Sequence, residues 1–257
     1  MMNATADKSG GAVVRSVPLF LVVVTALSLA SCGGPPSLHP YRCRTVPRDT
    51  FFQYVHTVAL VPLFTDDDPE GRQIQDQLVG ILARKFAPFG ITLIKPEIWS
   101  ECWKQQVFSG GGVFKSTDGS VDEARYQQVW RTCAVSLAGQ YGIDAVLDPA
   151  IIAVTAPLNQ DIVRWHGVAE DMRSFGQRFW TGGSYSGKVT AASLLVTIHG
   201  VEGNLLFENA GGIEVVGQLT GTRTDPLRQK PGFLKSTNKL NRAVNIVFRP
   251  LMMPTGQ

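Results

Sequence analysis

Apolar and polar residues recur along the chain with periods that predict an α/β fold. Thr57–Phe64 is a nearly unbroken apolar run, the pattern of a strand that is buried on both faces. The next segment has helical spacing, and its apolar residues form one stripe: Ile74, Leu78, Ile81, Leu82 and Phe86. Pro88 and Gly90 end this predicted helix, and Ile91–Ile94 follows as a short strand. The order strand, helix, strand predicts a sheet with helices packed on it.

Capping residues indicate where the predicted helices begin and end. Asp68 suits the N-cap of the first helix and Pro69 suits its first turn, where a missing N–H is no loss. Apolar residues on one side of Glu97–Gln106 predict a short second helix. Ser120-Val121-Asp122-Glu123 matches the capping box S-x-x-E and predicts the start of a third helix, which Gly142 ends.

The second half of the chain changes to strand periodicity. Ile143–Thr155 predicts a strand, and alternating apolar residues from Lys188 to Gly217 predict a meander that turns at Val201-Glu202-Gly203-Asn204. A closing helix, which Pro250 bends or ends, is predicted by the spacing of Leu240, Ala243, Val244, Val247 and Leu251. We therefore expect one mixed-sheet α/β sandwich with helices packed on one or both faces of the sheet.

The start of the chain has the anatomy of a secretory signal. Lys8 and Arg15 precede the apolar run Val17–Ala30, which is too short to span a bilayer comfortably. The stretch Leu29-Ala30-Ser31-Cys32 resembles the lipobox of bacterial lipoproteins, in which the cysteine is acylated and becomes the first residue of the mature protein. An ordinary signal-peptide cut next to an unmodified Cys32 is the alternative.

The lipobox resemblance implies a protein that is anchored by lipid and faces the periplasm. Gly33 stands where an aspartate signals retention at the inner membrane in many Gram-negative lipoproteins, so the resemblance implies the outer membrane. We expect a signal peptide over residues 1–31, then lipidated Cys32 and a disordered Gly- and Pro-rich tether over 32–50. The single α/β periplasmic domain is expected over 51–257, a length that suits one hydrophobic core.

Composition adds little to this picture of the function. The formal net charge of the whole chain is +3, which is too small and too evenly spread to indicate a nucleic-acid partner. Charged residues are sparse, and the 26 glycines fit a loop-rich envelope protein.

Three stretches of the body resemble the periplasmic lipoprotein superfamily that includes the curli secretion subunit CsgG, the penicillin-binding-protein activator LpoB and the exopolysaccharide export lipoprotein PelC. They are Val58-Ala59-Leu60-Val61-Pro62, Tyr141-Gly142-Ile143-Asp144-Ala145-Val146-Leu147 and Val201-Glu202-Gly203-Asn204-Leu205-Leu206. The resemblance implies a non-catalytic protein that assembles into rings or docks on envelope enzymes. Against the superfamily pattern, residues 164–187 are a long insertion between central strands.

This insertion mixes guanidinium and aromatic side chains, a composition that is enriched at binding hot spots. The alternative is that its rings fold back over the sheet and cover the core. The candidate partner-binding residues are Arg164, Trp165, Arg173, Phe175, Arg178, Phe179, Trp180 and Tyr185.

Cysteines other than Cys32 are Cys43, Cys102 and Cys133. Cys102 and Cys133 each fall on the apolar side of a predicted helix, so they are the better pair for a disulfide in an oxidising compartment. Buried, unpaired thiols are the alternative. The spacing of cysteines and histidines matches no zinc site.

Motifs for catalysis and cofactor binding are incomplete. Gly182–Lys188 fits G-x-x-x-x-G-K, but Val189 stands where Ser or Thr would hold magnesium, and a strand follows instead of a helix. Asp66, Asp67 and Asp68 lack the glycine and the distal glutamate of a calcium loop. We therefore expect no catalytic residue, no metal and no cofactor.

These observations predict a non-catalytic, lipid-anchored envelope protein, an accessory or assembly subunit for export, secretion or wall synthesis. We expect it to act through protein partners, a second copy of itself included. One alternative is a lipoprotein that binds a glycan or another solute in a deep pocket lined by Trp165, Trp180 and Tyr185. The last alternative is a hydrolase, which needs convergent carboxylates that the sequence does not supply.

Overall fold

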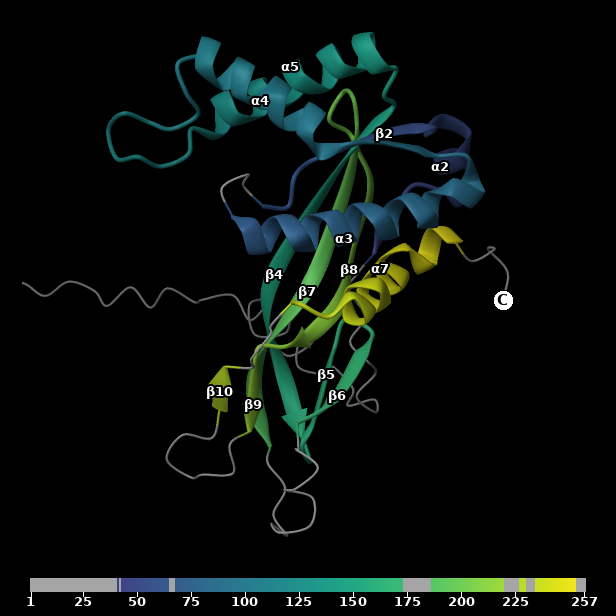
Figure 1. Ribbon diagram of the computed structural model, residues 1–257, viewed down its shortest axis with the longest axis vertical. Coiled ribbons are helices and arrows are strands. Elements are labelled where there is room, and N and C mark those ends of the chain that lie inside the picture. Colours follow the sequence, from purple (N-terminus) through teal and green to yellow (C-terminus); the bar gives the residue numbers. More distant parts are fainter. Residues whose placement is uncertain are drawn as a thin grey trace, which may run out of the picture. The chain divides into compact units, whose positions relative to one another are not determined.

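An eight-stranded sheet forms the centre of the fold, and its main path runs β1-β8-β7-β4-β2-β3 (Figure 1). The long middle strands β4 (Ala145–Asn159), β7 (Gly187–Gly200) and β8 (Leu205–Val215) are antiparallel. β2 (Thr57–Leu60) pairs in parallel with β4 on one side and with β3 (Thr92–Ile94) on the other. This computed structural model describes residues 41, 43–64, 68–172, 186–219, 227–229 and 234–252.

Short strands extend the sheet at its edges. β1 (Arg44–Thr45) pairs with β8, and β5 (Ile162–Trp165) and β6 (Val168–Asp171) form a hairpin that continues from β4. β9 (Gly217–Leu219) and β10 (Leu227–Gln229) pair in a separate two-stranded ribbon.

Helices cover both faces of the sheet, so the predicted mixed α/β sandwich is confirmed. On one face, α3 (Pro69–Phe86) and α7 (Thr237–Met252) bury their apolar stripes against β4, β7 and β8 in the largest core cluster. The short helix α2 (Arg48–Tyr54) contributes Phe51 to the same cluster. On the other face, α4 (Pro96–Ser109) and α5 (Glu123–Tyr141) pack over β2 and the start of β4.

The caps agree with the sequence prediction at α3 but not at the start of α5. The Asp68 side chain accepts a hydrogen bond from the Glu70 backbone N–H at 3.1 Å, as an N-cap should. The predicted capping box at Ser120 is wrong, because α5 begins later and the Asp122 side chain accepts from the Arg125 N–H. Ser120 instead donates to Asp118 in the preceding loop. Gly142 ends α5 in the left-handed conformation, as predicted.

Several boundaries differ from the prediction. β2 ends at Leu60; the Val61 N–H still donates to the Leu147 carbonyl of β4 at 2.8 Å, and Pro62 has no N–H with which to continue the pairing. α7 continues two residues past Pro250, so this proline lies in its last turn. Part of the predicted tether belongs to the fold, since β1 and the start of α2 lie within residues 32–50. Cys32 lies outside the described residues. None of the described helices combines the length and apolarity that a membrane span requires.

Candidate functional site

Most of the predicted partner-binding residues cannot be placed. Arg173, Phe175, Arg178, Phe179, Trp180 and Tyr185 lie outside the described residues, as do Asp66 and Asp67. Arg164 is half-buried on β5, within the β5–β6 hairpin. Trp165 is 2% exposed and its Nε1 donates to the Ala192 carbonyl at 3.2 Å. The Trp165 side chain therefore packs in a core cluster with residues from the end of β4 and the start of β7. It covers the core, as the alternative interpretation of the insertion expected, and it cannot line a ligand pocket.

A serine and a histidine meet in the fold, but not in a usable catalytic geometry. His166 Nδ1 lies 2.8 Å from the Ser193 hydroxyl. Ser193 is fully buried, so a substrate cannot reach its oxygen. Burial also lowers the pKa of His166, which keeps the imidazole neutral. The contact is structural: it ties the β5–β6 turn to β7.

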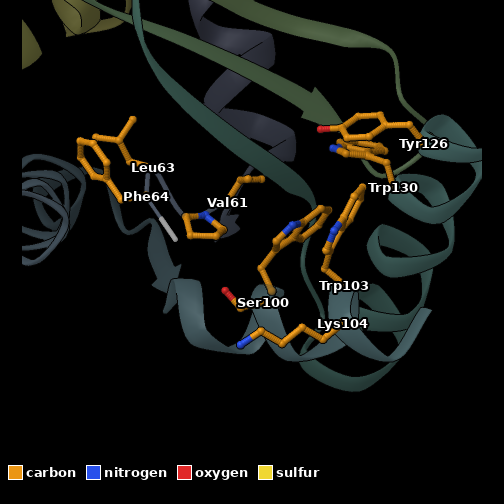
Figure 2. A pocket seen from close by; sticks show the side chains of 10 residues that line it. Val61, Leu63, Phe64, Ser100, Trp103, Lys104, Tyr126 and Trp130 are labelled. Atoms are coloured by element: carbon orange, nitrogen blue, oxygen red, sulfur yellow. The ribbon is translucent and has the colours of Figure 1, made fainter. Parts of the chain in front are cut away.

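A pocket of about 520 Å³ opens between the loop after β2 and the helices α4 and α5 (Figure 2). Its volume lies in the range of small-ligand sites, about 300–1,000 Å³. Leu63 and Phe64 lie on one side, and Trp103 and Tyr126 lie on the other. The ten lining residues are Val61, Pro62, Leu63, Phe64, Trp99, Ser100, Trp103, Lys104, Tyr126 and Trp130.

The loop wall of the pocket is held in place by α3. Gln75 is 7% exposed, and its side-chain oxygen accepts hydrogen bonds from the backbone N–H groups of Leu63 (3.0 Å) and Phe64 (3.4 Å). Gly71, one turn earlier, leaves room for the Phe64 ring: a Cβ at this glycine would lie 2.6 Å from Phe64 Cγ. Two residues of α3 thus fix the loop at the carboxyl end of β2.

The helix wall is built from two pairs of aromatic rings. The Trp103 and Tyr126 rings lie 5.0 Å apart with their planes tilted by 60°, and both side chains are half-buried. Behind them, Trp99 and Trp130 lie 5.8 Å apart and are almost fully buried. Each pair joins one residue of α4 to one of α5. Aromatic pairs at such separations add about 0.5–1.5 kcal/mol beyond their burial.

The back of this wall rests on the β7–β8 hairpin. His199, near the end of β7, packs edge-on against the Trp130 ring at 5.6 Å, and its Nδ1 lies 3.2 Å from the Gly203 carbonyl. The turn that was singled out in the sequence therefore supports the pocket, although it does not line it.

The two ends of the pocket differ in charge. Burial, and then the negative charges of Asp148 and Glu123, raise the pKa of Tyr126. Burial also raises the pKa of Asp148, against a smaller lowering by His199. Lys104 supplies the cation: it is exposed and lies on the other side of the indole rings from Tyr126 in Figure 2.

Cys102 on α4 and Cys133 on α5 lie next to each other, and both are free thiols in this structure. Burial raises the pKa of the Cys133 thiol, and a hydrogen bond with Cys102 raises it further. The proposed disulfide would thus join the two helices that form the aromatic wall.

This pocket was not predicted from the sequence, because aromatic residues at helical spacing also fit the buried face of an amphipathic helix. A detectable signal was present: four large aromatic residues, Trp99, Trp103, Tyr126 and Trp130, lie on only two helices. More rings gather there than one helix-to-sheet contact needs. Among the described residues, no group of three His, Cys, Asp or Glu side chains is arranged to hold a metal ion.

Comparisons with known proteins add no argument about the function. No protein-family model matches the chain, and no curated protein sequence matches it. Among solved structures, the PelC dodecamer from Paraburkholderia phytofirmans is similar at 10% identity and a TM-score of 0.35, over 83% of this chain and 97% of that one. The lipoprotein GNA1162 from Neisseria meningitidis is similar at 16% identity and a TM-score of 0.30, over 70% and 90%. Both scores are low, so the function has to be inferred from the chain's own residues.

Proposed function

We propose that this protein is a non-catalytic envelope lipoprotein, held at the periplasmic face of the outer membrane by acyl chains on Cys32. It serves as an accessory or assembly subunit for export, secretion or wall synthesis, and it acts by contacting partner proteins. Two or more acyl chains give stable membrane anchoring, at roughly 0.8 kcal/mol for each buried methylene.

The lining of the α4–α5 pocket is the observation that carries this proposal. Trp and Tyr are the residue types most enriched at the hot spots of protein interfaces. The polar side-chain groups among the ten lining residues are the Ser100 hydroxyl, the Lys104 ammonium, the Tyr126 hydroxyl and the indole N–H groups. None of the ten carries an imidazole, a thiol or a carboxylate, so the Ser100 hydroxyl has no His, Asp or Glu base among the lining side chains. Such a lining suits recognition.

A second copy of this chain is among the partner proteins that we propose. The insertion over residues 164–187 remains part of the proposal as a further contact surface. Arg164 is the member of that set that the structure places outside the fully buried core.

The anchor is tested by replacing Cys32 with Ala in the producing bacterium. We expect the wild-type protein in the membrane fraction and the Cys32→Ala variant in the soluble fraction, because the variant lacks the acylated side chain. Immunoblots of the two fractions give the result, and Cys43→Ala is the matched control. A Cys32→Ala variant that remains wholly with the membranes, or a wild-type N-terminus without acyl groups by mass spectrometry, would contradict the proposal.

A further inference from the structure

We infer that a basic groove along α7 contacts the phosphate headgroups of anionic phospholipids, in the same membrane that holds the acyl chains of Cys32. This inference rests on the proposed function and adds how the anchored domain is oriented. Three features of the groove lead to it: its charge, its lining and its position beside the point where the chain leads back to Cys32.

The groove lies along the outer side of α7, next to α3, and has a volume of about 480 Å³. Two hydrogen bonds join these helices: Lys85 Nζ donates to Asn245 Oδ1 at 2.7 Å. The Thr237 hydroxyl donates to Gln77 Oε1 at 2.9 Å. We call this surface the α7 groove, and its eight lining residues are Lys85, Asn238, Asn241, Arg242, Asn245, Ile246, Arg249 and Met252.

The α7 groove carries two half-buried cations whose partners are neutral. Lys85 donates to an amide oxygen, and Arg242 Nη2 donates to the Ile213 carbonyl at 2.7 Å. Within the described part of the chain, neither cation forms a salt bridge, and the buried Arg242 Nε has no hydrogen-bond partner. Arg249, the third cation of the lining, already has an interaction partner. Because buried charges are normally paired, we expect an anion from outside the chain at Lys85 and Arg242.

Acidic side chains near the two ends of α7 are already in contact with cations. Asp49 forms an ion pair at 3.4 Å with Arg48, whose Nε donates to a carbonyl in the last turn of α7. Near the start of α7, Lys239 pairs with Glu214 at 2.7 Å and with Glu170 at 3.5 Å. None of the eight lining residues carries a carboxylate. The groove itself is therefore positive, and it attracts an anion.

The lining suits lipid headgroups better than a protein segment. It contains no aromatic ring, the kind of side chain that is most enriched at the hot spots of protein interfaces. Its two large apolar residues, Ile246 and Met252, are half-buried, so the contact is limited to the headgroup region. The exposed amides of Asn238, Asn241 and Asn245 can donate hydrogen bonds to phosphate and glycerol oxygens.

The chain that leads back to Cys32 leaves the body beside the α7 groove. Tyr41 is the first described residue, and its ring packs edge-on against His166 at 5.5 Å. The next residue, Gly167, lies against the groove: a Cβ there would be 2.9 Å from Cγ2 of Ile246. Residues 32–41 span at most about 30 Å when fully extended. Lipid headgroups are therefore the anions that an acylated Cys32 keeps within reach of the groove.

Contact at the α7 groove sets the orientation of the domain, while the acyl chains supply the anchor. Each Lys or Arg at an anionic membrane surface favours binding by roughly fivefold, so two give about 25-fold. This is too little to hold an unanchored protein, and Cys32→Ala is still expected in the soluble fraction. Because α4 and α5 cover the opposite face of the sheet, their pocket then faces the periplasm.

The experiment uses the full acylated protein in nanodiscs of phosphatidylcholine, alone or mixed in equal parts with phosphatidylglycerol. Asn241→Cys places a thiol in the α7 groove, and Val135→Cys places one on α5, where the side chain is 61% exposed. A bulky, water-soluble maleimide labels each thiol, and peptide mass spectrometry measures the rates. We expect phosphatidylglycerol to slow the labelling of Asn241→Cys at least about tenfold and that of Val135→Cys by less than about twofold.

Charge variants separate the α7 groove from the rest of the surface. In the Asn241→Cys background, Lys85→Glu should remove the protection by phosphatidylglycerol, because it reverses one of the two charges. Lys115→Glu makes the same change at an exposed loop residue and should leave the protection in place. Salt at about 1 M, where the Debye length falls to about 3 Å, should also remove the protection. The salt measurement needs no charge variant, so it keeps the test valid even if Lys85→Glu unfolds.

Several results would overturn the inference. They are equal labelling of Asn241→Cys in the two kinds of nanodisc, equal protection of Val135→Cys, and protection that survives Lys85→Glu or high salt. Inorganic phosphate, polygalacturonate and poly-glutamate are added in parallel to nanodiscs of phosphatidylcholine alone. Protection by one of these, without protection by phosphatidylglycerol, would assign the groove to a soluble anion, an acidic glycan or an acidic protein segment.

Failure of this inference is distinguishable from failure of the proposed function. If mass spectrometry finds no acyl group on wild-type Cys32, the proposed function fails and the inference fails with it. If Cys32 is acylated and phosphatidylglycerol gives no protection at Asn241→Cys, the inference alone is refuted and the anchor stands.

Discussion

Asp148 illustrates how a single buried residue makes the fold sensitive to pH. It follows the segment of β4 that pairs with β2, and its carboxyl group lies close enough to Tyr126 and His199 to interact with their charges. Burial raises its pKa above the ordinary value of 3.8, so the folded protein favours the protonated carboxyl group. The unfolded chain ionises this group at lower pH. The contribution of Asp148 to stability is therefore largest below about pH 4 and falls as the pH rises through its folded-state pKa.

Replacing Asp148 with Asn should remove the cost of burying this carboxylate in its ionised form. We expect Asp148→Asn to raise the free energy of unfolding at pH 7 relative to wild type, and the gain should shrink toward zero as the pH approaches 3.8. Urea titrations at a series of pH values measure the gain in the free energy of unfolding and its dependence on pH. The control is Asp118→Asn, because the pKa of Asp118 is lowered by hydrogen bonds from Ser120. Asp118→Asn should instead lower the free energy of unfolding at pH 7. If Asp148→Asn raises the free energy of unfolding by an amount that does not change with pH, the explanation is disproved.

At the scale of elements, periodicity predicted most of the helices and strands but not the contacts between them. The stripe of α3, the αL glycine that ends α5 and the β7–β8 hairpin were all evident, because each depends on residues close in sequence. The position of α5's first residue was not, because Ser120 and Asp122 both suit an N-cap, and Val121 between them pairs with Phe114 in a β-bridge. The pocket was not predicted either, since it needs α4, α5 and the loop after β2 together.

The adjacent thiols of α4 and α5 lead to an element-scale prediction. In an oxidising periplasm we expect Cys102 and Cys133 to form a disulfide, which stabilises the protein by roughly 2–4 kcal/mol because it restricts the unfolded chain. Alkylation of the unfolded, unreduced protein followed by mass spectrometry should then label Cys43 but neither of this pair. Labelling of Cys102 and Cys133 without reductant would show that they remain thiols in the envelope.

At the scale of the whole molecule, the sheet and α7 touch through a glycine. A Cβ at Gly211, on β8, would lie 2.4 Å from the Ala243 carbonyl oxygen of α7, which is backbone and cannot rotate away. The largest core cluster depends on this close approach, because α7 contributes Val244, Val247 and Phe248 to it. No local pattern in the sequence distinguishes Gly211 from a glycine in a flexible stretch.

Gly211→Ala should therefore destabilise the protein, by about 1–3 kcal/mol or more, the usual cost of overpacking a core. Gly139→Ala is the matched control, since nothing lies within 4 Å of a Cβ at this position in α5 and alanine favours a helix. It should stabilise by roughly 0.5–1 kcal/mol. Thermal unfolding of both variants tests the pair; an unchanged melting temperature for Gly211→Ala would show that α7 can shift without cost.

The sequence by itself determined the α/β class and the order of the elements, because these depend on spacing and on residue types that are neighbours along the chain. The lipobox-like signal at Cys32 stays a prediction. The tertiary structure decided that Trp165 belongs to the core and that Trp103, Tyr126 and Lys104 form one open pocket with a loop from another part of the chain. The physical reason is that a side chain's role depends on what is packed against it. Those contacts join residues far apart in sequence, which no local period encodes.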